Sequence, residues 1–533
     1  MLTIEDPRTD RRNRPALIVG ILALTGLTVS IMQTLVVPLL PHLPQILGAA
    51  PDDTTWVLTV TLMVGAVCTP ISGRLGDMFG KRRMLLLSLG AMVLGSTICA
   101  LSSSLAPMLV GRAFQGASLG AIALGISLMR DILPRERLGG AVALMSATLG
   151  IGGAIGLPVS AVVAQHTSWH WLFVGSAVFG LVALGAIALL VPETPIRTGG
   201  RFDAPGAALV SVVLVALLLA LTKAHAWGWS DVRTIGLLAA SGVLALVFVW
   251  VERHTAQPLV DLQVSAKPAV LYTNLASVLV GFAMYSINLV MTQVLQAPTS
   301  TGFGFGQSMV VAGLCSAPMG FMMMVGSPLA ARIIARRGPR FSLRLGVSVI
   351  ALGFGFGIFT LHAIWQAIVV SLIVGAGIAL SYAAMPTLIM RSVPSTQTAA
   401  ANSVNTLSRS VGTSLASAIH GSIIAAALAA VTTSFGPLSP VAFCFLLAVV
   451  ACCAAFVLAT LIPESAGAPS RVSETEALAG IEGIDDARPA PEPRRRATLA
   501  RVVRRPGQLV RRTWRSRPDP RPAARRRRGA RVR

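Results

Sequence analysis

One arginine stands inside a long apolar run of this sequence. Residues 109–128 read LVGRAFQGASLGAIALGISL, in which Arg112 and Gln115 carry the only charge and the only amide. A helix places residues three apart on one face, and an arginine within a membrane segment usually points into the bundle or a wet cavity. We therefore expect this pair to line a central path. The simpler alternative is an arginine whose head group reaches the membrane surface.

One histidine within an apolar run could exchange a proton near neutral pH. His420 is the only histidine placed in the middle of an apolar run, and an unperturbed imidazole titrates near pH ~6.5. The same side chain could equally serve as a hydrogen-bonding residue between packed helices. The Asp and Glu residues all fall in loops, helix ends or terminal segments. No predicted helix presents paired carboxylates or a metal-binding pattern such as HExxH, so we expect no enzyme activity, no metal and no cofactor.

The shortage of deep carboxylates also bears on the compound that such a path would carry. A permanent organic cation would meet no buried countercharge, whereas Arg112 could attract an anion. We therefore expect a small amphipathic substrate that is neutral or anionic. The amide side chains that we expect in its cavity are Asn288, Gln293 and Gln115.

The fold that must position these residues is an all-α integral membrane protein. The chain is 54% hydrophobic and 12% charged, with a mean hydropathy of +0.73, whereas soluble domains carry about 25% charged residues. A membrane-spanning helix needs about 20 mostly apolar residues. Fourteen runs meet this condition, at residues 16–38, 55–72, 84–102, 106–129, 138–164, 171–191, 206–223, 233–251, 269–295, 308–330, 345–361, 366–390, 410–431 and 439–462.

A repeat divides these spans into two halves. PISGRLGDMFGKR from Pro70 and PLAARIIARRGPR from Pro328 align at an offset of 258, and each joins a second helix to a third. Internal repeats are typical of secondary transporters, whose binding sites lie between the repeats near the middle of the membrane. We expect a six-helix bundle at 16–191, two inserted helices at 206–251 and a second six-helix bundle at 269–462.

Positive charge predicts the orientation in the membrane. Cytoplasmic loops carry the excess of Lys and Arg, and one set of alternating loops holds nearly all of it here, so residues 1–15 and 463–533 are both expected in the cytoplasm. Between Arg494 and Arg533 stand seventeen Arg and one Asp, which contribute +16 of the net charge of +23. Such a segment beside a membrane binds anionic lipid. We expect lipid rather than nucleic acid as its partner, and a monomeric protein.

The loop GRLGDMFGKRR at 73–83 combines flexible and charged residues. Its glycines permit tight turns, and its one acid lies among four basic residues, so its ion pairs can differ between two packings of the bundle. The loop resembles the signature loop of the major facilitator superfamily, in which the acid helps to latch one conformation. The resemblance implies a latch made of Gly73, Arg74, Asp77, Gly80, Lys81 and Arg82. The second copy has Ala335 in place of the acid, so this latch would be one-sided.

The stretch LGIGGAIGLPVSAV at 149–162 brings Gly152 and Gly156 close to Pro158. Small residues allow helices to approach closely, and an internal proline bends a helix. The stretch is similar to the fifth-helix antiporter motif of exporters in this superfamily, although Ser160 and Ala161 replace its closing glycine pair. Generic tight packing is the alternative interpretation.

Residues 15–463 as a whole resemble the drug:H+ antiporter branch with fourteen helices, in which LVGRAFQGASLG matches the fourth-helix pattern. The resemblance implies a multidrug or antibiotic efflux transporter of the bacterial cell membrane. It implies proton antiport by alternating access, with Arg112 and Gln115 tied to proton coupling. Members of the branch often carry an acid in the first helix, where this chain has Gln33. The alternative function is the proton-coupled or facilitative import of a small metabolite.

Overall fold

The computed structural model describes residues 7–39, 43–194, 196–428 and 439–463, and within these ranges every regular element is a helix. The Arg-rich tail lies outside the described residues. The fold class predicted from the sequence is therefore confirmed as all-helical. Twelve of the described helices are long and apolar enough to cross a membrane. The predicted number of fourteen is not reached by this criterion.

The first part of the chain forms seven long helices and three short ones. The predicted fourth span is broken into α6 and α7, because the chain turns at residues 118–120 between them. The short elements are η1 (Val37–Leu39), α2 (Leu43–Leu47) and α3 (Pro51–Thr54). The long helices are α1 (Pro7–Thr34), α4 (Trp56–Phe79), α5 (Lys81–Leu101), α6 (Leu105–Ala117), α7 (Ala121–Ile132), α8 (Arg135–His166) and α9 (His170–Leu190).

The remaining helices follow a connection at residues 191–203. Short elements are α12 (Leu262–Ser265), η2 (Thr299–Thr301) and η3 (Ser395–Gln397). The long helices are α10 (Ala204–Trp227), α11 (Val232–His254), α13 (Pro268–Gln296), α14 (Met309–Thr360), α15 (Ile364–Ser392), α16 (Thr398–Leu428) and α17 (Pro440–Leu461). The α14 range joins two predicted spans, and its backbone leaves the helical conformation at Gly338 (φ 83°, ψ 162°).

The predicted span 410–431 is wrong at its start, because α16 begins twelve residues earlier, at Thr398. The predicted span begins just after Arg409, because a charged residue in an apolar run indicates a membrane boundary. The structure instead places Arg409 inside the helix, where it is only 7% exposed. This correction places Arg409 among the buried arginines of the helix bundle, together with Arg74 and Arg112.

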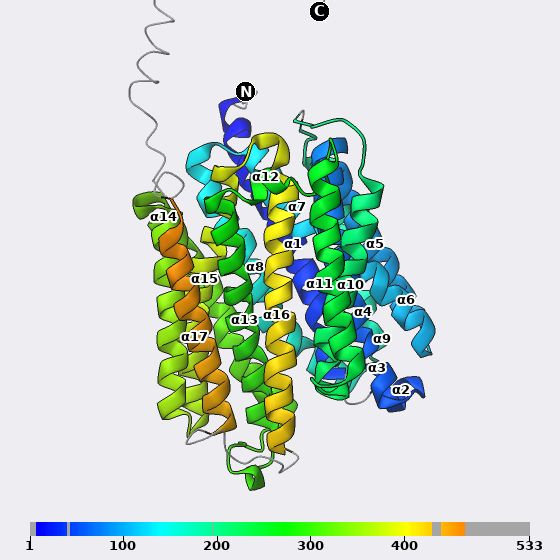
Figure 1. The fold of residues 1–533 in the computed structure, drawn as a ribbon, viewed down its shortest axis with the longest axis vertical. Coiled ribbons are helices and arrows are strands. Elements are labelled where there is room, and N and C mark those ends of the chain that lie inside the picture. The colour runs from blue at the N-terminus through cyan, green and yellow to red at the C-terminus, as the bar shows by residue number, and fades with distance from the viewer. Residues whose placement is uncertain (1–6, 40–42, 195, 429–438, 464–533) are drawn as a thin grey trace, which may run out of the picture. The chain divides into compact units, whose positions relative to one another are not determined.

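Two large apolar clusters form the core of the bundle. One gathers side chains mainly from α1, α5, α7, α8 and α9, and the other mainly from α13, α14, α15 and α17. Helices α10 and α11 pack against each other, and α10 also contacts α4 and α16 (Figure 1). The α8–α14 and α4–α16 contacts join the first group of helices to the second.

The repeat read from the sequence has a counterpart in the backbone. Gly80 and Gly338, which are 258 residues apart, both have positive φ (117° and 83°). The arginine two positions after each of these glycines also makes the same kind of contact in both halves. Arg82 donates from Nη2 to the carbonyl of Ala188 near the end of α9 (2.6 Å), and Arg340 donates from Nε to the carbonyl of Ala459 near the end of α17 (3.3 Å). Each arginine thus satisfies carbonyls that a helix end leaves unpaired.

Candidate transport and latch sites

Asp77 ties α4 to the start of α16. Its Oδ2 accepts a hydrogen bond from the N–H of Ala400 (2.8 Å), and its Oδ1 accepts one from the N–H of Ala399 (3.2 Å). These amides belong to the first turn of α16, where N–H groups lack partners inside the helix and the helix dipole favours an anion. The acid that the sequence singled out therefore caps a helix more than 300 residues away.

Lys81 lies at the centre of the same cluster and is fully buried. Its Nζ donates to Oδ2 of Asp131 (2.6 Å) and to Oγ1 of Thr398 (2.8 Å), and it lies 3.7 Å from Oδ1 of Asp77. One ammonium group thus lies between carboxylates of α4 and α7 and also contacts the first residue of α16. Sequence reasoning missed Asp131. The feature that could have revealed it is its position directly after Arg130, at the end of an apolar run.

The predicted loop at 73–83 is wrong, because α4 continues to Phe79 and α5 begins at Lys81, which leaves only Gly80 between them. Two of its three glycines make the contact with α16 possible, for different reasons. A Cβ on Gly73 would overlap the Ser403 side chain and lie 2.7 Å from the carbonyl oxygen of Ala399, so only glycine lets α4 and α16 approach this closely. Gly80 has φ of 117°, which L side chains rarely adopt. We call the end of the bundle that holds Asp77, Lys81 and the start of α16 the latch end.

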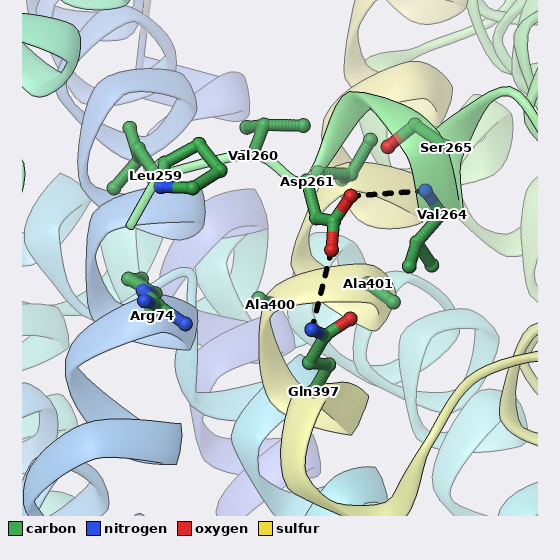
Figure 2. A pocket seen from close by; sticks show the side chains of 11 residues that line it. Arg74, Leu259, Val260, Asp261, Val264, Ser265, Gln397, Ala400 and Ala401 are labelled. Atoms are coloured by element: carbon green, nitrogen blue, oxygen red, sulfur yellow. Dashed lines mark hydrogen bonds between the residues drawn. The ribbon is translucent and has the colours of Figure 1, made fainter. Parts of the chain in front are cut away.

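Arg74 lies beside the segment that precedes α13. It lines a cavity of about 30 Å³ together with the connection before α13 and the start of α16 (Figure 2). Its Nε is buried and has no hydrogen-bond partner among the described residues. In the same cavity Asp261 accepts hydrogen bonds from Val264 N (3.0 Å) and Gln397 Nε2 (3.3 Å). The structure therefore brings all six residues of the predicted latch to one end of the bundle, with Arg74 and Arg82 at its edges.

Arg112 lies in the interior of the bundle and is 1% exposed. Its Nε donates to the carbonyl of Val57 on α4 (3.1 Å), and its Nη1 donates to the carbonyl of Met32 on α1 (3.4 Å) and to Oε1 of Gln115 (2.7 Å). Gln115 in turn donates from Nε2 to Ser96 on α5 (2.8 Å). The guanidinium therefore does not reach the surface of the protein. The arginine joins three helices through neutral acceptors.

The glycines of α8 lie on two faces of the helix, one in contact with α1 and the other with α14. Gly152 and Gly156 pack against α1: a Cβ on Gly152 would overlap Ser30 and lie 3.0 Å from Ile31 N, and one on Gly156 would overlap Thr34. Gly150 lies against α14, where a Cβ would meet the Met323 side chain. Pro158 lies inside α8, so the carbonyl one turn earlier loses its donor.

His420 is fully buried between α13 and α16. Its Nε2 lies 2.7 Å from Oγ of Ser286, and its ring lies 5.0 Å from that of Phe282. Because the Ser286 hydroxyl donates to the carbonyl of Phe282 (2.8 Å), its oxygen is left to accept from Nε2–H. The other ring nitrogen, Nδ1, is buried without a hydrogen-bond partner among the described residues.

The other predicted cavity residues are not gathered into one site. Gln33 is half-buried on α1, and Gln293 is exposed on α13. Asn288 is half-buried and donates from Nδ2 to the carbonyl of Met284 in its own helix (2.9 Å). Asn288 and Gln293 are five residues apart, which places them about 140° from each other around α13, so they do not share one face.

Arg409 is a second residue that sequence reasoning missed. Its Nη1 donates to Oδ1 of Asn405 (2.9 Å) and its Nη2 to Oγ1 of Thr406 (3.1 Å). Its guanidinium carbon lies 5.0 Å from the centroid of the Tyr382 ring on α15. The available signal was the sequence NTLSR, in which an amide precedes the arginine by one helical turn.

A bundle of apolar helices in which the same turn and the same arginine cap occur twice is consistent with a secondary transporter, since many of these are built from internal repeats. The chain belongs to the Major Facilitator Superfamily, whose family model matches residues 22–417. It is a multi-pass membrane protein of that family.

Several known proteins are similar to it over most of its length. It is 27% identical over 422 residues to multidrug resistance protein Stp of Mycobacterium tuberculosis, with 78% of each chain covered. It is 29% identical over 426 residues to the tetracenomycin C resistance and export protein of Streptomyces glaucescens, with 79% of this chain and 78% of the relative covered. The human organic anion transporter MFSD10 has a similar fold, with a TM-score of 0.59, 16% identity and coverage of 84% and 99%.

Proposed function

We propose that this protein exports small amphipathic compounds, such as drugs or antibiotics, by proton antiport with alternating access. The observation that carries the proposal is the latch between α4 and α16, in which Asp77 caps a helix of the second repeat and Lys81 bridges Asp77, Asp131 and Thr398. A transporter needs such a reversible contact to close one end of its path. The names of the two bacterial relatives, one for multidrug resistance and one for export, support the outward direction.

In this proposal the structure represents the state closed at the latch end. Opening requires Asp77 to leave the α16 amides, while Lys81 can keep its pairing with Asp131 on its own side. Arg112 supplies a fixed positive charge on the central path, and Gln115 orients its guanidinium. His420 is the titratable group that we propose to carry the proton, and Gln33 lies on the same path. Asn288 and Gln293 are proposed as contacts with the substrate.

The proposed topology has fourteen spans. The residues Val310–Thr360 are one of the twelve apolar helices, and they count as two spans because the helix is interrupted at Gly338. The less apolar α16 is the remaining span, since it packs along α13 and α4. The two six-helix bundles are then 16–191 and 269–462, with α10 and α11 inserted between them. Both termini lie in the cytoplasm of a bacterial cell, and the protein is a monomer.

The Arg-rich tail is proposed to bind anionic lipids of the inner membrane. Each Arg near such a surface contributes about 1 kcal/mol, so seventeen arginines are ample for adhesion. In this proposal the tail does not bind nucleic acid.

Transport by everted membrane vesicles tests the proposed function. Vesicles from cells that produce the protein are given dyes and antibiotics that are cationic, neutral or anionic, with and without a protonophore. Accumulation that requires the proton gradient supports export from cells. Absence of accumulation, together with uptake of a metabolite by intact cells, supports the importer instead.

A further inference from the structure

We propose that Arg409 binds an anionic group of the transported compound, such as a carboxylate, a sulfonate or a phenolate. This inference rests on the proposed function and names the class of substrate. The site is formed by α16, which carries Arg409, by α15, which carries Tyr382, and by α13, whose Asn274 and Ser277 hold Asn405.

The first reason is the charge of Arg409. The residue is 7% exposed, and its guanidinium donates to two neutral oxygens, those of Asn405 and Thr406. No carboxylate of the described residues forms an ion pair with it. A guanidinium has five N–H donors, and a buried charge without a countercharge is costly. An anion that enters from outside therefore gains an interaction that the protein itself leaves unmade.

The second reason is that the guanidinium is held in place before any ligand arrives. Asn405 accepts from Arg409 and donates from Nδ2 to Ser277 (2.7 Å) and Asn274 (3.0 Å) on α13. On the other helix, the Tyr382 ring lies 5.0 Å from the guanidinium carbon, within cation–π distance. Fixing the donor group in advance reduces the entropy lost on binding.

The third reason is the position of Arg409 at the seam between the repeats. Asn402 lies on the same face of α16, seven residues earlier, and it donates to Ser127 of α7 (3.3 Å). The main-chain oxygen of Tyr382 accepts from Ser146 of α8 (3.0 Å). Arg409 is about 10 Å along the helix from Asn402, deeper than the latch end. Transporters of this kind hold substrates at the repeat interface near the middle of the membrane.

The neighbours of the guanidinium suit the apolar part of an amphipathic anion. Tyr382 supplies an aromatic face, and its hydroxyl lies 2.7 Å from the Met284 sulfur. The Met385 sulfur lies 2.9 Å from Ser277 Oγ, next to Asn405. Methionines adapt to ligands of different shape, and the fork of N–H donors on the guanidinium matches the oxygens of an anionic group such as a carboxylate. The site therefore favours aromatic organic anions over organic cations.

The test uses everted vesicles and three probes that differ in charge: fluorescein as the anion, chloramphenicol as the neutral compound and rhodamine 123 as the cation. For Arg409→Gln we expect at least an about tenfold loss of fluorescein accumulation, since hydrogen bonds to charged groups contribute about 1.5–3 kcal/mol. Chloramphenicol accumulation should change less than about twofold. Arg409→Lys should lie between the wild type and Arg409→Gln. Arg233→Gln removes an exposed arginine at the start of α11 and is the matched control.

A second variant keeps Arg409 and supplies its countercharge from the protein. Asn405→Asp places a carboxylate where the amide oxygen already lies 2.9 Å from Arg409 Nη1, with almost no change in volume. We expect it to reduce fluorescein accumulation as Arg409→Gln does. If Arg409→Gln does not reach the membrane, this variant tests instead whether Arg409 binds the anionic group.

Several outcomes would overturn the inference. They are a wild type that exports only rhodamine 123, an Arg409→Gln variant that loses all three probes equally, and an Asn405→Asp variant that exports fluorescein as well as the wild type does. If the wild type accumulates no probe at all, it is the proposed function that fails. Equilibrium binding of fluorescein to the purified full chain in detergent then decides the inference alone: wild type must bind at least about tenfold more tightly than Arg409→Gln.

Discussion

The carboxylate of Asp77 accepts a hydrogen bond from the main-chain N–H of Ala400, at 2.8 Å, across 323 positions of the chain. One residue belongs to the first repeat and the other to the first turn of α16. A side chain at the end of one helix therefore completes the N-terminus of another, and the contact is lost if the two separate. The first prediction follows from this contact.

Asp77→Asn should weaken closure at the latch end, because an amide keeps one acceptor but loses the charge that the helix N-terminus favours. Hydrogen bonds to charged groups contribute about 1.5–3 kcal/mol, so the open population should rise by about tenfold or more. The measurement is thiol labelling of Ser403→Cys, a position that is fully buried against Gly73, in a background without native cysteines. Asp53→Asn, at an exposed carboxylate, is the control. Equal labelling of Asp77→Asn and its parent would contradict the latch.

Gly152→Ala should destabilise the protein by about 1–3 kcal/mol, the usual cost of overpacking. The added methyl would overlap Ser30 and press on the backbone of α1. Gly153→Ala is the matched control one residue away, since its Cβ meets nothing within 4 Å. Alanine there should be neutral or stabilising, because it has the better helix propensity. Thermal unfolding of the two purified variants checks the difference, and equal midpoints would rule out the α1–α8 contact.

Arg112→Lys should reduce proton-driven transport by at least about tenfold, although it keeps the charge. A lysine ammonium cannot reproduce the planar fork that reaches Val57, Met32 and Gln115 at once. Initial rates of dye uptake in everted vesicles are the measurement. Arg336→Lys, at an exposed arginine of the second loop copy, should be silent. If Arg112→Lys transports as the wild type does, the geometry of the guanidinium is not required.

His420→Gln separates the two roles considered for this histidine. Glutamine can keep a hydrogen bond to Ser286 but cannot take up a proton. If His420 carries the proton, the variant should fold and equilibrate substrate but no longer accumulate it against a gradient when a pH difference is imposed. Accumulation at the wild-type level would show that His420 only joins α13 to α16 and that another group carries the proton.

The sequence predicted the features that depend on local pattern. Apolar runs of membrane-spanning length revealed the helices, because burial in lipid demands such runs whatever their neighbours are. The offset of 258 revealed the repeat, and Gly80 with Gly338 and Arg82 with Arg340 show its physical content: the same turn and the same helix cap occur in both halves. Asp77 could be singled out because one acid among four bases is conspicuous in a short segment.

Prediction from the sequence failed where the role of a residue depends on side chains of other helices. Arg409 was taken as a boundary because hydropathy treats a charge as a cost, and the compensating contacts come from Asn405 on its own helix and Tyr382 on another. Asn288 and Gln293 were predicted from residue type alone. The structure shows that Asn288 donates within its own helix and that Gln293 is exposed, and their contact with a substrate stays a prediction.

By itself, the sequence determined that this chain is a repeated bundle of membrane helices with a charged segment at 73–83, since length, hydropathy and spacing are local properties. Only the tertiary structure decided what those charges meet: Asp77 meets the amides of α16, and Arg112 meets carbonyls of α1 and α4. Partners separated by tens to hundreds of residues are chosen by helix packing. The energy of a buried charge depends on the groups within a few ångströms of it, which no local pattern contains.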